Sequence, residues 1–411
     1  MAIEALSGWT RQQKFVVTAA FLGWTLDAFD FFLMVFVLKD IATEFGTDVK
    51  AVSYALLLTL AARPVGAFLF GRLADRVGRR PALMIDVLVY SALGFASGFS
   101  SSLTMLLVLR TLFGVAMGGE WGVGSSLAME TIPAKARGFV SGLLQAGYPF
   151  GYLLASLAFW FLFPIIGWRG MLMLGALPAL LIFFVRMGVP ESPVWTERKH
   201  EKPVGTFSVI ARHWKIALYA IVLMTAFNFF SHGSQDLYPT FLRVQHKFDA
   251  HTVGTITVIL NIGAIFGGII FGSLSQRIGR RRAIVIAALI ALPVLPLWGL
   301  PSDPVWLAVG AFLMQISVQG AWGVIPVHLN ELSPPEARGT FPGTVYQLGN
   351  LIAAYNATLQ SGIAESNDNN YGYPMMLVIG IVAVAIALLA GFGVEARGVN
   401  LAKSEPATPL G

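Results

Sequence analysis

The sequence predicts an all-helical membrane protein whose twelve spans form two similar halves of six. Three observations lead to this prediction. Of the 411 residues, 56% are hydrophobic and only 12% are charged, whereas soluble domains carry about 25% charged residues. Apolar runs long enough to cross about 30 Å of hydrocarbon as helices recur along the chain. A set of residues in the first half also recurs in the second half at a constant offset of 201 positions.

The apolar runs are expected to be helices, because a lone strand in lipid would leave its backbone N–H and C=O groups unpaired. The 43 glycines and 21 prolines suit closely packed and locally broken membrane helices. The expected halves are residues 1–189 and 216–411, joined by a polar cytoplasmic linker at 190–215. The expected spans are residues 15–38, 51–71, 81–100, 103–128, 138–164, 168–188, 216–242, 252–274, 283–300, 304–328, 340–364 and 373–394.

The distribution of Lys and Arg predicts that both termini are cytoplasmic. In that orientation the 28 basic residues divide into 21 on the inner side, 5 on the outer side and 2 within spans. Such an excess is typical of cytoplasmic loops. The protein is therefore expected to be a multi-pass protein of the cytoplasmic (inner) membrane, inserted by its first span without a removable signal peptide.

Several activities are disfavoured by what the sequence lacks. There is no cysteine, which excludes disulfides and thiolate metal sites. No nucleotide-binding loop, metal-ligand spacing or catalytic triad occurs outside the spans, so we expect no enzyme, no metal site and no cofactor, with the proton as coupling ion. The net charge of +6 comes from loops between spans, so no nucleic-acid partner is expected. The expected partners are a small organic anion and the lipid bilayer, and the chain is expected to be a monomer.

The internal repeat is carried by several separate anchors. Residues 71–80 (GRLADRVGRR) recur as residues 272–281 (GSLSQRIGRR). Anchors that share one offset over so long a stretch indicate a duplicated six-span unit, and transporters built from such repeats hold their substrate near the midplane between the units. The same offset aligns Trp121 with Trp322, Glu130 with Glu331, Pro133 with Pro334 and Arg137 with Arg338.

These motifs resemble the signatures of the major facilitator superfamily. Residues 71–80 resemble its loop signature between the second and third helices, and 272–282 resemble the degenerate second copy. Arg110 to Gly118 resembles the fourth-helix motif, and Pro190 to Pro193 resembles the end of the sixth helix. The resemblance implies the major facilitator fold. It implies gating or structural roles for Gly71, Asp75, Arg76, Gly78, Arg79, Arg110, Arg137, Gly272, Gly279 and Arg280.

Asp75 is the residue of these loops best suited to a conformational role. Paired with Arg137 or Arg79, it would form a cytoplasmic latch that breaks in one conformation. The alternative is that the loops only fix the topology of the chain.

Charged residues within spans are further candidates, because a charge near the bilayer centre costs at least about 2.5 kcal/mol. Asp27 and Asp30 share one helix face and can exchange a proton; the alternative is that they pair with Arg63 or Arg110. Arg63 is the candidate clamp for a substrate carboxylate, because a guanidinium can bind a carboxylate through two parallel hydrogen bonds. Glu120 is a second candidate proton carrier.

The repeat shows that the embedded charge is unequal between the halves. The offset places Ala264 at the position of Arg63 and Ala321 at that of Glu120. We therefore expect proton handling in the first half and substrate hydrogen bonding in the second. Asp86, near the expected cytoplasmic end of the third span, is expected to be solvated or paired.

The seventh span carries the densest group of polar side chains. His232 lies one turn before Asp236, and a histidine beside a carboxylate can pass a proton near neutral pH. Gly233 and Pro239 would allow the helix to break, as sites near the midplane often require. The polar residues spaced i, i+3, i+4 and i+7 on one face are Asn228, Ser231, His232 and Gln235.

This span resembles the seventh-helix signature of fungal lactate permeases within the sialate:proton symporter family. Three other stretches resemble the same family: residues 27–32, 63–66 and 346–350. The chain departs from those permeases in lacking long terminal extensions, which suggests a bacterial member, and in carrying Glu120. The resemblance implies roles in monocarboxylate transport for Arg63, His232, Asp236, Gln347 and Asn350.

The sequence thus predicts a proton-coupled symporter of small monocarboxylates, lactate or pyruvate first, working by alternating access. The alternatives are a proton symporter of sialic acid or another larger organic acid, passive facilitation without protons, and a non-transporting sensor with the same fold. The predicted substrate-binding residues are Arg63, Asn228, His232, Gln235, Gln347 and Asn350. The predicted proton-coupling residues are Asp27, Asp30, Glu120, His232 and Asp236.

Overall fold

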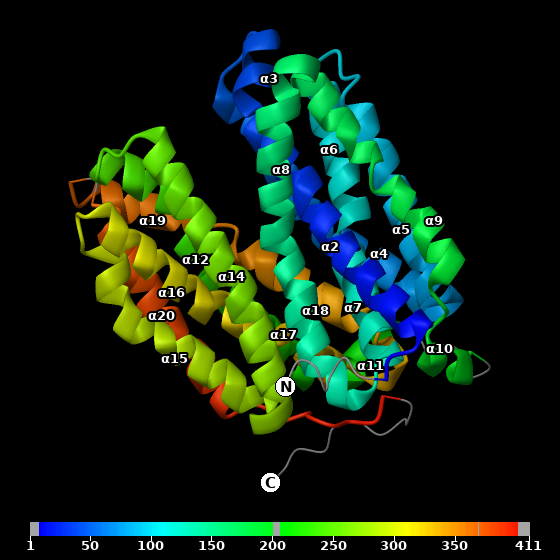
Figure 1. Ribbon diagram of the computed structural model, residues 1–411. Coiled ribbons are helices and arrows are strands. Elements are labelled where there is room, and N and C mark those ends of the chain that lie inside the picture. Colours follow the sequence, from blue (N-terminus) through cyan, green and yellow to red (C-terminus); the bar gives the residue numbers. More distant parts are fainter. Residues whose placement is uncertain (1–7, 200–205, 369, 402–411) are drawn as a thin grey trace.

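The computed structural model describes residues 8–199, 206–368 and 370–401, which are helical almost throughout (Figure 1). The N-terminal half contains α2 (Arg11–Phe36), α3 (Leu38–Glu44), α4 (Val49–Val77), α5 (Arg79–Ser97), α6 (Leu103–Met117), α7 (Glu120–Thr131), α8 (Arg137–Met173) and α9 (Ala179–Gly188). The linker holds α10 (Pro193–Arg198) and α11 (Thr206–Arg212). The C-terminal half contains α12 (Trp214–Gln235), α13 (Tyr238–Thr240), the π-helical η3 (Phe241–Gln245), α14 (Ala250–Ile278), α15 (Arg280–Gly299), α16 (Pro304–Trp322), α17 (Ile325–Leu332), α18 (Phe341–Ala353), α19 (Asn356–Glu365) and α20 (Gly372–Gly391).

Helices occupy all the expected spans in the part of the chain that the structure describes. By length and apolar composition, 9 helical segments of this part can cross a membrane. One of them, Ala134–Leu181, contains the fifth expected span and much of the sixth, and Gly167 separates the two with φ 60°, a conformation that glycine adopts without strain. The third expected span is α5, and the eleventh is divided between α18 and α19; neither is among those segments. The predicted fold class is therefore confirmed.

The helix of the seventh span is interrupted beside the polar cluster. Of the two residues expected to allow this break, only Pro239 lies next to it. α12 ends at Gln235 and α13 begins at Tyr238, so Pro239 lies in the first turn of α13. Proline is tolerated there because the first turn of a helix needs no N–H donor. Gly233 remains inside α12, and its carbonyl accepts a hydrogen bond from Gln360 Nε2 at 3.1 Å. The expectation that Gly233 breaks the helix is wrong.

The two halves lie side by side and meet toward one end of the molecule (Figure 1). α8 packs against α14, and α4 packs against α18. The halves converge at the end that holds the loop 71–80, and they diverge toward α3 and α19 (Figure 1). We call the converging end the predicted cytoplasmic end, because the charge distribution assigns it to that side.

Glycines let the backbones of the two halves touch at this interface. A Cβ on Gly142 of α8 would overlap the carbonyl oxygen of Gly268 in α14, and a Cβ on Gly272 would press against Gly138 and Gly142. Small residues are common where membrane helices pack this closely. A larger residue at Gly142 would therefore force the halves apart.

The two copies of the loop signature build the same helix cap. Gly78 (φ 111°) and Gly279 (φ 100°) precede α5 and α15 in a conformation that favours glycine. Glu191 accepts hydrogen bonds from the first two backbone N–H groups of α5, and Glu395 does so for α15. Carboxylates are favourable at helix N-termini. Burial raises the pKa of Glu191, and its hydrogen bonds to these N–H groups oppose that shift.

Residues 392–401, the C-terminal strap, run beneath both halves at the predicted cytoplasmic end (Figure 1). Arg137 Nη1 of the N-terminal half donates to the carbonyl of Val399 at 3.0 Å. Arg338 donates to the carbonyl of Leu401, whose side chain is buried with 1% of its surface exposed. The strap therefore links the two halves at the end where they converge.

Candidate functional site

A cavity of about 420 Å³ lies between the two halves. Helices α2, α4 and α8 supply its N-terminal wall, and α12, α14, α16 and α18 supply most of its C-terminal wall. Of the residues predicted to bind substrate or protons, those that line it are Arg63, Asn228, His232, Gln235, Asp236 and Asn350. Those outside its lining are Gln347, Asp27, Asp30 and Glu120.

Arg63 brings a positive charge to the wall of this cavity. It lies in the middle of α4 directly before Pro64, and only 3% of its surface is exposed. Its Nη2 donates to the sulfur of Met117 at 2.9 Å and lies 3.8 Å from Asp27 Oδ2. Its Nε has no hydrogen-bond partner among the described residues. The long ion pair leaves the guanidinium able to bind a carboxylate from the cavity.

Asp27 and Asp30 lie behind this wall rather than in it. Both are buried, with 1% and 3% of their surfaces exposed. Within the described part of the chain, none of their four carboxylate oxygens has a hydrogen-bond partner. Since an unpaired buried carboxylate is costly when ionised, the charge of Asp27 depends on how closely Arg63 approaches it.

The other embedded charges of the N-terminal half are equally buried. Arg110 lies over the ring of Phe113 at 3.9 Å from its centroid, an interaction that holds its side chain in place. Glu120 begins α7, and its carboxylate occupies the space that a Cβ on Gly23 of α2 would fill. Asp86 is fully buried, and its carboxylate has no hydrogen-bond partner in the described residues. The expectation of a solvated or paired Asp86 is wrong, because α5 packs against α6 and α7 and shields it.

On the opposite wall, His232 connects α12 to α18. Its Nδ1 lies 3.1 Å from Asp236 Oδ2, and its Nε2 lies 2.9 Å from Asn350 Oδ1. Asn350 Nδ2 in turn donates to Gln347 Oε1 at 3.4 Å. Both acceptors are satisfied at once by an imidazolium, whereas a neutral ring requires the Asn350 amide to turn. A change of charge on His232 therefore changes how it bonds to α18.

The remaining predicted residues take different positions on this wall. Asn228 lines the cavity and donates to the carbonyl of Met224 at 2.7 Å. Gln235 also lines it, and its Nε2 donates to Gln315 Oε1 at 2.9 Å. Gln347 is 1% exposed and lies behind Asn350. Its position suits orienting Asn350 better than touching a substrate.

Sequence reasoning missed several polar residues of the cavity. Gln145, Tyr148 and Tyr152 line it from α8 at i, i+3 and i+7, a spacing that places them on one helix face. Asn261 and Gln319 line it from α14 and α16. The α8 spacing was available in the sequence, and so was a weaker signal for the other two, because Asn261 lies four residues after Thr257 and Gln319 four residues after Gln315.

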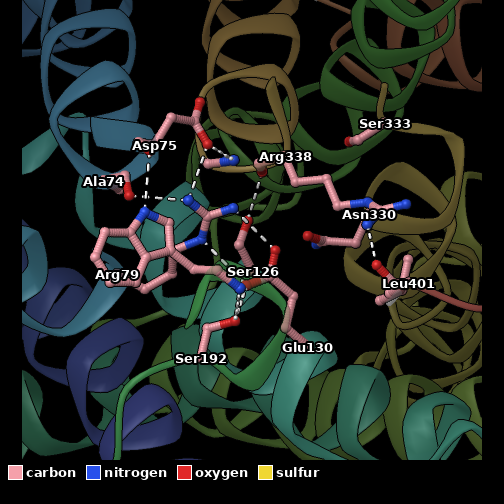
Figure 2. Close-up of polar contacts among 12 residues, drawn as sticks. Ala74, Asp75, Arg79, Ser126, Glu130, Ser192, Asn330, Ser333, Arg338 and Leu401 are labelled. Carbon is pink, nitrogen blue, oxygen red and sulfur yellow. Dashed lines mark hydrogen bonds and ion pairs between the residues drawn. The ribbon is translucent and has the colours of Figure 1, made fainter. Parts of the chain in front are cut away.

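At the predicted cytoplasmic end, Asp75 joins the halves through backbone hydrogen bonds. Its carboxylate accepts from the N–H of Gly339 at 2.8 Å, and from the N–H and hydroxyl of Thr340 at 3.0 and 2.6 Å. Figure 2 shows Arg79 between Asp75 and Glu130, at 2.9 and 3.0 Å from their oxygens. Arg137 does not contact Asp75 and approaches Glu331 at 3.8 Å instead. Of the two partners considered for Asp75, the structure has Arg79 and not Arg137.

The other signature residues support these contacts. A Cβ on Gly71 would overlap the backbone of Gly339 and Thr340. In the second copy, Arg280 pairs with Glu331 at 2.9 Å. Arg76 is exposed, so its charge lies at the surface.

Comparisons with known proteins find a matching family, related sequences and a similar fold. The sequence matches the family described as Major Facilitator Superfamily over residues 20–355 and 223–409. It is 31% identical over 373 residues to a carboxylic acid transporter protein homolog of Saccharomyces cerevisiae, a match that covers 84% of this chain and 60% of the yeast protein. It is 29% identical over 407 residues to the sialic acid transporter NanX of Escherichia coli, covering 95% of this chain and 98% of that one. The fold resembles that of the proton:xylose symporter XylE with a TM-score of 0.79 at 18% identity, covering 95% and 98% of the two chains.

Proposed function

Because the chain belongs to the Major Facilitator Superfamily, whose members matched here are transporters rather than enzymes, we propose that it is a proton-coupled symporter of small monocarboxylates. Lactate and pyruvate are the first candidate substrates. The observation that carries the proposal is the position of Arg63, a buried cation on the wall of the cavity between the halves. The carboxylic acid and sialic acid transport named for two relatives supports the same class of substrate.

Coupling to a proton follows from the charge of the substrate. Carboxyl groups titrate near pH 4, so a small monocarboxylate is almost fully ionised at neutral pH. Moving one negative charge inward against a negative interior costs about 2.3 kcal/mol per 100 mV. Transport of one proton with each anion removes this cost and uses the pH gradient.

Each wall of the cavity takes a separate part in substrate binding. The Arg63 guanidinium holds the carboxylate through two parallel hydrogen bonds. Asn350, Asn228 and Gln235 bind the hydroxyl or keto oxygen from the C-terminal half. Gln347 orients Asn350 through the 3.4 Å hydrogen bond between their side chains.

The proton is carried on both sides of the cavity. His232 and Asp236 take it up at the wall, where their side chains are 28% and 40% exposed. Asp27 and Asp30 hold it behind Arg63, and Glu120 is a further carrier in the same half. When a substrate carboxylate draws Arg63 away from Asp27, the 3.8 Å pair weakens and a protonated Asp27 is favoured. Substrate and proton then bind together.

Transport proceeds by rocking of the halves about this site. In the described state they are joined at the predicted cytoplasmic end by Asp75 and the C-terminal strap. Breaking these contacts opens the cavity toward the predicted cytoplasmic end. We propose a monomer without cofactor in the cytoplasmic membrane, with both termini in the cytoplasm.

The proposal is tested by uptake of labelled lactate into liposomes that contain the purified protein. Uptake driven by an inward proton gradient, and lost in His232→Ala, is the expected result. No uptake under the gradient contradicts the proposed function, whereas unchanged uptake in His232→Ala contradicts only the role of that residue. Because of the similarity to NanX, sialic acid is the second candidate substrate, and stronger competition by unlabelled sialic acid than by pyruvate would favour it.

A further inference from the structure

Aromatic side chains form a continuous wall along the cavity. Each ring centroid lies within 6.5 Å of the next, and most neighbours meet edge to face. The first four rings come from α2 and α8 of the N-terminal half, and the last two come from α18 and α16 of the C-terminal half. In order along the wall the rings, here called the aromatic belt, are Phe31, Phe32, Tyr148, Trp24, Tyr346 and Trp322, and all of them line the cavity.

The belt ends at the buried cation and is fixed in place. The guanidinium carbon of Arg63 lies 5.6 Å from the centroid of Phe31. At the other end, the Trp322 indole N–H donates to the carbonyl of Phe227 at 3.1 Å. Edge-to-face contacts of this kind are a preferred arrangement of aromatic pairs. The belt is therefore an ordered surface that begins at a carboxylate-binding group.

Two buried amide oxygens beside the belt have no partner within the described residues. They are Oε1 of Gln145 in α8 and Oε1 of Gln319 in α16, and both residues line the cavity. Buried acceptors normally receive a hydrogen bond. A hydroxyl group of a bound molecule would supply it.

Resting on the proposed function, we propose that the preferred substrates are carboxylates attached to a flat unsaturated ring, of which benzoate is the simplest. The carboxylate pairs with Arg63, and the ring packs against the aromatic belt. A hydroxyl on the ring donates to Gln145 or Gln319. An open-chain hydroxy acid such as lactate makes the first of these contacts but has no ring for the second.

The size of the cavity agrees with this class. A cavity of about 150 Å³ already holds benzene, so the 420 Å³ of this one leaves room for a ring and its carboxylate. Aromatic walls also attract organic cations, but Arg63 at the end of the belt repels them. The proposal therefore commits to an anion with a ring.

The test is equilibrium binding to the detergent-purified full chain at one pH. Binding is used instead of uptake because benzoate is a permeant weak acid that would itself collapse a proton gradient in liposomes. The probes are benzoate, cyclohexanecarboxylate, lactate and choline. Cyclohexanecarboxylate matches benzoate in carbon count and charge but lacks a flat ring. The expected result is that benzoate binds about tenfold more tightly than cyclohexanecarboxylate, the contribution expected of one good aromatic contact.

Variants of α8 assign this preference to the belt. Tyr148→Leu is expected to bring the ratio of the two affinities close to one, and Tyr148→Phe is expected to preserve it. Phe150→Leu is the matched control, because Phe150 is two residues away, is 40% exposed and lies outside the cavity lining. A ratio near one in the unchanged protein, an unchanged ratio in Tyr148→Leu, or tighter binding of choline than of benzoate overturns the inference. If lactate uptake is proton-driven while the ratio is near one, only this inference fails; if no acid binds and no uptake occurs, the proposed function fails with it.

Discussion

Asp75 and Gln276 occupy equivalent positions of the two halves, and each accepts a hydrogen bond from a backbone N–H across the interface. Asp75 bonds to Gly339 at 2.8 Å, and Gln276 bonds to Gly138 at 3.2 Å. The two glycines are themselves separated by the repeat offset of 201 residues. The two positions are related by the repeat, but the acceptor is charged at Asp75 and neutral at Gln276. The hydrogen bond at Asp75 is therefore the stronger of the two.

The charged member of this pair should set the balance between conformations. Charged hydrogen bonds contribute about 1.5–3 kcal/mol against about 1 kcal/mol for neutral ones. Asp75→Asn is therefore expected to shift the population away from the described state by about two- to thirtyfold. Spin labels at Val77→Cys and Ile278→Cys would report the separation of the halves, since the chain has no other cysteine. Arg76→Gln, a change at an exposed residue, is the control, and equal distance distributions in both variants would contradict the prediction.

Substitutions of Arg63 should show whether it binds the carboxylate through two hydrogen bonds or only through its positive charge. Arg63→Lys retains the charge but loses the planar fork, and is expected to raise the KM for the carboxylate about tenfold. Arg63→Gln is expected to raise it about a hundredfold, in line with loss of a charged hydrogen bond. Initial rates of proton-driven uptake give both values. Equal rates for the Lys variant and the unchanged protein would show that only the charge matters.

Substitution of Asp236 should weaken proton coupling without stopping the movement of substrate. Asp236→Asn removes the carboxylate that lies 3.1 Å from His232, and an amide cannot take up a proton near neutral pH. Proton-driven accumulation is expected to fall at least about tenfold, while exchange of labelled for unlabelled substrate at equal pH continues. Asp249→Asn, an exposed N-cap residue of α14, is the control because Asn also caps helices. Loss of both accumulation and exchange would instead indicate a role in substrate binding.

The C-terminal strap should stabilise the closed predicted cytoplasmic end. Leu401→Asp places a carboxylate at a site that is 1% exposed, which is costly without a partner. The strap is expected to detach, and the Val77 to Ile278 label distance to lengthen. Asn400→Asp introduces the same charge at the neighbouring exposed position and should leave the distance unchanged. Identical distances in the two variants would show that the strap does not hold the halves together.

The fold was accessible from sequence because lipid imposes local rules. Every span must satisfy its own backbone, so helix length and apolar composition alone locate it. Even the interrupted seventh span followed this rule, although Pro239 proved to lie in the first turn of α13 and Gly233 stayed helical. The repeat predicted that the two halves have the same structure. The equivalent helix caps formed by Glu191 and Glu395 are one example of this.

The site was accessible only in part. The stripe on α12 follows from helical spacing, and Asn228, Ser231, His232 and Gln235 all line the cavity. The spacing of residues along the sequence does not determine, however, how a helix is rotated relative to its neighbours. Gln347 and Asn350 share a helix face by sequence, yet only Asn350 reaches the cavity.

The sequence by itself determined the spans, the duplicated halves and the polar stripe of the seventh span, because each depends on residues close together in the chain or at one fixed offset. Tertiary structure decided that Arg63 faces the cavity while Asp27 lies behind it, and that Asp75 pairs with Arg79 rather than Arg137. It also brought together the aromatic belt, whose rings come from four helices of both halves. These relationships depend on helix rotation and on the conformational state of the halves, and neither is encoded in local spacing.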